Sequence, residues 1–289
     1  MDVGVDQPGH DVIRFGVSAT ALDRCTADGA VAASSPSDVS RRAGVVFSML
    51  PTAEHVAAAL TGSGGAVEGA DEGNIFVELS TIERSAVDDL AARLLPVGAA
   101  LLDGGVSASP RMAWNGSATL LIGGPDDSFA TAEPVLRAMG GRLIHTGPLG
   151  TAKVAKLVNN LVGAGSMALL SEAFVLGQRG GVEPDVLHDA MMASWARCAH
   201  LEVLPPVESL RPAKVDDDRF PDFSIDYMIK DLWCVLATAK ERRSPALITA
   251  LVHQLFVAAT AQGFGGDGIW NVIEPMWSLA GEPPTPPGT

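Results

Sequence analysis

The sequence predicts an α/β domain with a mostly parallel, right-handed sheet, followed by an all-helical domain. Short β-type runs alternate with helical patterns as far as residue 148, which is typical of βαβ units. Strand patterns then vanish and long helical patterns occupy residues 149–282. A length of 289 residues fits about two domains. We therefore predict a boundary near residue 148, and we expect the proline-rich residues 283–289 to be a disordered tail.

The individual elements follow from local pattern and composition. Runs rich in β-branched and aliphatic residues predict strands at 11–15, 44–50, 74–79, 99–103, 119–122 and 142–145. Helical patterns predict helices at 19–28, 56–60, 82–95 and 129–139, then at 152–179, 185–194, 225–242 and 245–262. Residues 154–176 are the most apolar stretch, but Lys156, Asn159, Asn160 and Glu172 interrupt it. This stretch is therefore interpreted as a buried helix and not as a membrane span.

Composition excludes several classes of function. Lysine and arginine total 20 and aspartate and glutamate total 34, so the net charge is −14. Nucleic acid is an improbable partner for so acidic a chain, because phosphate binding needs clustered cations. The first residues have neither a basic start nor an apolar run, so we expect a cytoplasmic protein. Cys25, Cys198 and Cys234 are far apart and predict reduced thiols, and no histidine or cysteine spacing predicts a metal site.

Polar or glycine-rich turns follow three of the predicted strands. They are residues 49–52, 80–82 and 103–109, and Ser80 or Thr81 could cap the helix that follows. Ligands of parallel sheets bind at the carboxyl ends of the strands. Each turn alone fits ordinary turn chemistry. The three together favour a binding pocket at this edge.

The long helix that opens the second domain carries the strongest chemical pattern. Lys156 and Asn160 are four residues apart, so they share a helix face, and apolar residues surround them. Polar groups in such a run are costly unless they have partners, and a buried lysine can exchange a proton near neutral pH. The alternative is a solvated helix end with Lys156 exposed. Lys230 and Asp231 form a second polar group, for which a surface ion pair is the simplest interpretation. No P-loop, HExxH or GxSxG pattern supports another chemistry.

These motifs, in this order, resemble the β-hydroxyacid dehydrogenases, the family of 3-hydroxyisobutyrate dehydrogenase and tartronate semialdehyde reductase. The resemblance runs from about Gly9 to Gly263. Its carriers are Gly9-His10-Asp11-Val12, Ser48-Met49-Leu50-Pro51, Glu78-Leu79-Ser80-Thr81-Ile82, Asp103 to Ser109, Gly147 to Asn160, and Lys230-Asp231-Leu232. The resemblance implies a Rossmann-like dinucleotide-binding domain, then a helical substrate and dimerisation domain.

The resemblance also implies roles for individual residues. Lys156 would be the general acid or base, Asn160 would orient the substrate, and the turn of Ser107, Ala108 and Ser109 would hold its carboxylate. The cofactor would be NAD or NADP, and its binding site would be lined by Leu50, Pro51, His55, Thr81 and Lys230. The implied reaction interconverts a small 3-hydroxy acid and its semialdehyde by hydride transfer. The implied assembly is a homodimer or homotetramer, and the long apolar helix favours a second subunit as one of its partners.

Four departures from the family pattern leave alternatives open. The family's first strand and its GxGxxG turn have no counterpart before Gly9, and neither an acidic nor a basic residue after the second strand selects NAD or NADP. Gly104-Gly105 replaces Ala-Pro, which we expect to loosen the approach to the site, and Ser107-Ala108-Ser109 replaces Ser-Gly-Gly, which narrows the turn. The alternatives are a non-catalytic scaffold that has lost dinucleotide binding, and an enzyme related to imine reductases. Lys156 argues against the latter, because imine reductases usually carry another residue at that place.

Overall fold

The computed structural model describes residues 12–16, 18–203 and 223–281. The chain divides into two compact units, residues 1–157 and 158–289. The division falls inside helix α7 (Thr151–Arg179), so the first turns of this helix belong to the sheet-containing unit. The tail at 283–289 and the predicted motif at Gly9 to Asp11 lie outside the described residues.

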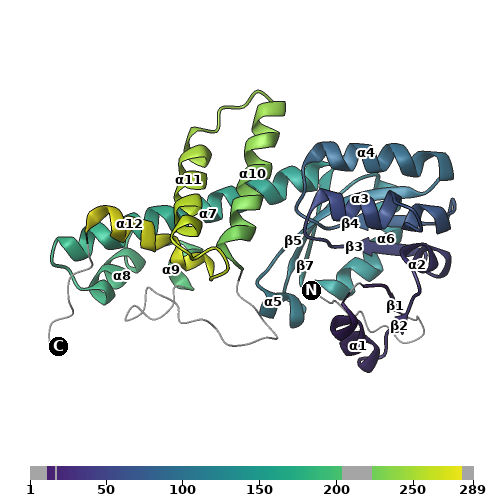
Figure 1. Ribbon diagram of the computed structural model, residues 1–289, viewed down its shortest axis with the longest axis horizontal. Helices are drawn as coiled ribbons and strands as arrows, with labels where there is room; N and C mark the ends of the chain where they lie inside the picture. Colours follow the sequence, from purple (N-terminus) through teal and green to yellow (C-terminus); the bar gives the residue numbers. More distant parts are fainter. Residues whose placement is uncertain (1–11, 17, 204–222, 282–289) are drawn as a thin grey trace. The chain divides into compact units, whose positions relative to one another are not determined.

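The first unit contains a five-stranded sheet, visible in Figure 1. In spatial order its strands are β3 (Val45–Ser48), β4 (Ile75–Glu78), β5 (Ala100–Ser107), β6 (Thr119–Gly123) and β7 (Arg142–Gly147). All neighbours are parallel except β5 and β6, which are antiparallel. The prediction of a mostly parallel sheet is therefore confirmed. A separate parallel pair, β1 (Ile13–Arg14) and β2 (Val31–Ala32), does not hydrogen-bond with these five strands.

Helices connect the strands of the first unit. They are α1 (Ala19–Ala27), α2 (Pro36–Arg42), α3 (Ala53–Thr61), α4 (Arg84–Leu94), α5 (Pro110–Trp114) and α6 (Asp126–Met139). The sequence did not predict β2, α2 or α5, because such short elements carry too few residues for a period to show. One apolar core contains residues of β3, β4, α3 and α4, and a second contains residues of β4, β5, β6 and α6. Both cores fix the carboxyl ends of the strands.

The second unit is helical, as predicted. Besides most of α7 it contains α8 (Pro184–Met192), α9 (Ala199–Glu202), α10 (Ile225–Glu241), α11 (Leu247–Ala261) and α12 (Glu274–Ala280). One core joins α7, α10 and α11 around Met167, Leu232 and Phe256. By length and composition alone α7 could cross a membrane, a test that core helices of soluble proteins also pass. Cys25, Cys198 and Cys234 form no disulfide bond.

Candidate active site

Two of the predicted turns leave the sheet side by side. Ser48 pairs with Glu78 at the carboxyl ends of the parallel strands β3 and β4, so the chain leaves both strands at one edge. The hydroxyl of Ser80 accepts a hydrogen bond from the backbone N–H of Leu50 at 2.8 Å and ties the turns together. The expectation that Ser80 or Thr81 caps the next helix is wrong, because Glu83 holds that position without a side-chain hydrogen bond. Ser80 is used to join turns instead.

The residues expected to line the cofactor remain accessible on these turns. Leu50 and Thr81 are half-buried, and Pro51 and His55 are exposed. Thr52 caps the first turn of α3, because its hydroxyl accepts a hydrogen bond from the backbone N–H of His55 at 3.4 Å; the same hydroxyl lies 2.8 Å from Nδ1 of His55. These side chains leave a surface that a flat ring or a ribose could contact.

The turn after β5 carries the residues expected to bind the substrate. Ser107 is the last residue of the strand and Ala108 follows it, both half-buried, while Ser109 is exposed. The hydroxyl of Ser109 accepts a hydrogen bond from the N–H of Met112 at 3.3 Å and so begins α5. Ser109 therefore has a local structural role. Ser107 and the backbone beside it remain the better candidates for holding a carboxylate.

The two glycines before this turn do not loosen it, and that expectation was wrong. A Cβ on Gly104 would lie 2.5 Å from Leu79 and 2.9 Å from Ile122. A Cβ on Gly105 would lie 2.8 Å from Cβ and 2.9 Å from Cγ of Lys156. Real Cβ atoms essentially never approach so closely. Glycine is required because neighbouring side chains occupy this space.

Lys156 therefore lies against β5 at Gly105, which precedes Ser107 by two residues. Its aliphatic stem packs on Gly105, and the side chain as a whole is half-buried. Neither sequence interpretation described it fully, since it is neither enclosed nor at a solvated helix end. A half-buried side chain whose stem is held by packing suits a group that must meet a ligand and exchange a proton.

The lysine that is enclosed is Lys153, which the sequence analysis did not single out. It is 1% exposed, and its Nζ lies 2.5 Å from Oε2 of Glu78, which is itself 0% exposed. The same Nζ donates to the carbonyl oxygens of Glu78 at 2.8 Å, Ser80 at 2.7 Å and Gly104 at 2.7 Å. Its place one turn before Lys156 in α7 was visible in the sequence. Its partners are far away in the chain, so they were not.

A second buried carboxylate holds the start of α7. Asp103, at 0% exposure, accepts hydrogen bonds from the backbone N–H groups of Gly150 at 2.5 Å and Lys153 at 2.9 Å. The first N–H groups of a helix lack partners within the helix, and a negative charge near them is favourable. Asp103 thus fixes the helix that carries Lys156 to the strand that carries Ser107.

In the second unit, Asn160, Lys230 and Asp231 form one cluster. Asn160 is 8% exposed and its Nδ2 donates to Oδ2 of Asp231 at 2.6 Å, while Nζ of Lys230 lies 3.1 Å from Oδ1. Asp231 is 2% exposed, so the interpretation of Lys230 and Asp231 as a simple surface ion pair was wrong. Asp231 was not predicted as a site residue. Its carboxylate orients the amide of Asn160 and the ammonium of Lys230, both of which were predicted as site residues.

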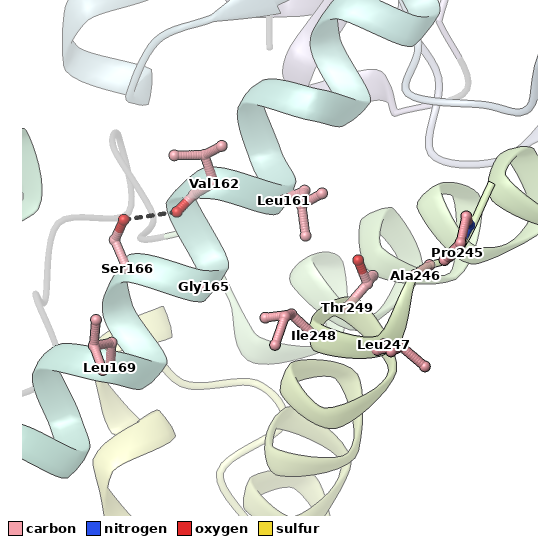
Figure 2. A pocket seen from close by; sticks show the side chains of 10 residues that line it. All are labelled: Leu161, Val162, Gly165, Ser166, Leu169, Pro245, Ala246, Leu247, Ile248 and Thr249. Atoms are coloured by element: carbon pink, nitrogen blue, oxygen red, sulfur yellow. Dashed lines mark hydrogen bonds between the residues drawn. The ribbon is translucent and has the colours of Figure 1, made fainter.

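Away from these residues, the second unit has an apolar hollow between α7 and the start of α11 (Figure 2). Figure 2 shows Leu161 and Ile248 on facing sides of it, with Gly165 on the α7 side. Exposed apolar side chains on both helices line it, namely Val162, Leu169 and Leu247, and exposed Leu251 lies further along α11. In the described part of the chain no titratable group lines this hollow, so it offers no acid–base chemistry. Among the described residues no cluster of histidine, cysteine, aspartate or glutamate could hold a metal ion.

Comparison with known proteins matches both units. Residues 1–147 match the NAD-binding domain of 6-phosphogluconate dehydrogenase, and residues 150–276 match the NAD-binding domain of NADP-dependent 3-hydroxyisobutyrate dehydrogenase. The mitochondrial 3-hydroxyisobutyrate dehydrogenase of Homo sapiens is 30% identical over 267 residues, which are 92% of this chain and 80% of the relative. L-threonate dehydrogenase of Cupriavidus necator is 30% identical and covers 88% of this chain and 84% of its own length. A solved Mycobacterium tuberculosis 3-hydroxyisobutyrate dehydrogenase with L-serine superimposes with a TM-score of 0.81 at 27% identity, over 93% of this chain and 91% of that one.

Proposed function

Because the chain belongs to the β-hydroxyacid dehydrogenase family, whose members use NAD or NADP, we propose that it interconverts a small 3-hydroxy acid and its semialdehyde. Lys156 is the general acid in reduction and the general base in oxidation. The observation that carries this assignment is the packing of the Lys156 stem on Gly105, two residues before Ser107. This contact brings a proton-exchanging group beside the turn that is expected to hold the substrate.

The residues at the edge of β3 and β4 fit the nicotinamide side of the cofactor. The Ser80–Leu50 hydrogen bond fixes two turns, while Leu50, Pro51 and Thr81 keep accessible surface for contact. When bound, the nicotinamide supplies or accepts the hydride, and the protein orients it. In this proposal His55 completes the same surface, and Lys230 contributes a positive charge to the bound complex.

The substrate is expected to be a small anion. Ser107 and the backbone after it offer hydrogen bonds to a carboxylate, and Lys156 adds positive charge beside them. Asn160 orients the substrate, and its own amide is oriented by Asp231 at 2.6 Å. Ala108 and Ser109 narrow the turn, which favours compact acids over branched ones.

We also propose that a second copy of the chain covers the apolar face of the helical unit. Leu169 is 68% exposed, Leu247 is 82% exposed and Leu251 is 70% exposed, beside the hollow of Figure 2. Contiguous exposed apolar surface of this kind is typical of an interaction site. In a homodimer or homotetramer, identical chains would cover this face of one another.

The test of the reaction is reduction of NAD or NADP with a panel of small 3-hydroxy acids, comparing the parent with Lys156→Ala. The variant is expected to lose about 10²–10⁴-fold in kcat, because a general acid–base group contributes about that much. Its circular dichroism and melting temperature should stay close to those of the parent. Lys240→Ala, which removes an exposed lysine of α10, is the matched control and should keep full activity. Full turnover by Lys156→Ala would contradict the proposal, as would turnover of a cyclic imine but of no hydroxy acid.

A further inference from the structure

Lys153 holds a position that the proposed chemistry does not use. It is 1% exposed, so it cannot meet a substrate directly, and its Nζ has four acceptor oxygens within 2.8 Å. An ammonium carries three hydrogens, so every one of them is engaged. Such a buried charge is costly to desolvate, and its partners compensate that cost. A neutral apolar residue of similar size would fill the same space without the cost.

The acceptors of Lys153 come from the end of β4 with its turn and from the interior of β5, the two strands that carry the candidate site. Glu78 and Ser80 lie at the end of β4 and in its turn, and Gly104 lies in β5 next to Gly105. Glu78 also acts on the turn, because its Oε1 accepts a hydrogen bond from the N–H of Ser80 at 2.8 Å. One ammonium therefore joins helix α7 to both strands, β4 and β5.

The consequence for Lys156 follows from helix geometry. Lys153 precedes Lys156 by three residues, about one turn, so a shift of α7 along the strands would move both by the same amount. The stem of Lys156 fills the space beside Gly105, where an added Cβ would lie 2.8 Å from its Cβ and 2.9 Å from its Cγ, so such a shift would change this packing. Displacements of about 1 Å at a reacting group can cost about 10²-fold in rate.

We propose that Lys153, paired with Glu78, is a positioning residue that fixes the register of α7 on β4 and β5 and thereby places the ammonium of Lys156. This inference rests on the proposed role of Lys156. It assigns Lys153 no contact with substrate or cofactor. It predicts that the protein still folds when the ion pair is replaced by neutral residues, but that the ammonium of Lys156 is then displaced.

The test uses the double variant Lys153→Met with Glu78→Gln. Removing one partner alone would leave a buried unpaired charge and could prevent folding. In the double variant neither charge remains, and the amide introduced by Glu78→Gln still offers an oxygen to the N–H of Ser80. We expect a folded protein with a melting temperature within about 5–8 °C of the parent. The control is Arg137→Met with Glu133→Gln, which removes an exposed ion pair of 2.6 Å on α6.

Two measurements distinguish a displaced Lys156 from a misfolded protein and from a failure of the proposed function. The first is the trace acetylation rate of Lys156 relative to exposed Lys240, followed by mass spectrometry without cofactor or substrate. We expect this ratio to change at least about threefold in the double variant, since the surroundings of the Lys156 ammonium change. An unchanged ratio in a folded double variant would overturn the inference, whether or not the parent turns over hydroxy acids.

The second readout applies once the parent shows turnover. We expect kcat to fall by about 10–100-fold, with the dissociation constant for the cofactor unchanged. The deuterium isotope effect on kcat should rise, because the chemical step becomes slower than product release. A kcat equal to that of the parent would overturn the inference. A silent parent would refute the proposed function alone, leaving the acetylation result to decide on placement.

Discussion

The two units of this protein differ in how many charged groups they enclose and in how much apolar surface they expose. The sheet unit buries Glu78, Asp103 and Lys153 almost completely and gives each of them close partners. The helical unit instead leaves leucines at 68–83% exposure, among them Leu169, Leu247 and Leu279. Buried charge is tolerable only with partners, and exposed apolar surface is costly until something covers it. Among the described residues, both units give their buried charges partners, as Asp231 shows in the helical unit, and the sheet unit also exposes Leu95 at 78%; the helical unit differs by exposing several leucines, which leaves it more surface for another molecule.

The largest effect on this contrast is expected from Asp103→Ala in the sheet unit. It removes the acceptor of two buried N–H groups, which should lower the free energy of unfolding by about 2–5 kcal/mol. Denaturant unfolding measures the loss. Glu202→Ala, which breaks an exposed ion pair with Arg197 in the helical unit, should cost less than about 1 kcal/mol. An equal loss of unfolding free energy in the two variants would mean that the buried carboxylate of Asp103 contributes no more stability than an exposed ion pair.

A second prediction concerns the apolar face of the helical unit. Ile248→Asp places a charge beside the hollow of Figure 2, where Ile248 is 67% exposed. If a second copy covers this face, the variant should weaken association by about 10–100-fold, because its unpaired carboxylate would be buried in an apolar interface. Light scattering across a dilution series measures the change in mass. Leu95→Asp, at a 78% exposed leucine of the sheet unit, is the control and should leave the assembly intact.

The smallest effects are expected from two glycines, one in each unit. Gly105→Ala should destabilise the sheet unit by about 1–3 kcal/mol, because the new methyl group overlaps the stem of Lys156. Gly165→Ala, in the interior of α7 with open space around it, should stabilise the helical unit by about 0.5–1 kcal/mol. Thermal unfolding of both variants tests the difference in sign. Destabilisation of the same size at both positions would contradict the view that Gly105 is crowded by Lys156 while Gly165 has open space around it.

Local patterns predicted the elements and part of the candidate site. The run of β-branched residues at β4 and the apolar period of α4 are properties of neighbouring residues, so they can be read without a structure. The turns at Leu50 and Thr81 were found for the same reason, whereas strand β5 continues to Ser107 through residues that were expected to lie in a turn. The short helix α5 was missed because so short a segment gives no period.

Long-range pairing could not be predicted in the same way. Lys153 and Glu78 are 75 residues apart in the chain, and Asn160 and Asp231 are 71 apart. Nothing in either local sequence says that one will be the partner of the other. The same limit explains the error at Gly104 and Gly105, since glycine creates space only where nothing else fills it.

By itself the sequence determined the order of the longer strands and helices, the change from sheet to helix near residue 150, and the motifs of the dehydrogenase family. These depend on periodicity and on residue types that stand close together in the chain. Only the tertiary structure decided which lysine is buried, which is half-exposed, and which backbone oxygens hold the buried one. Burial and pairing are properties of packing between distant segments, and packing is set when the strands and helix α7 come together.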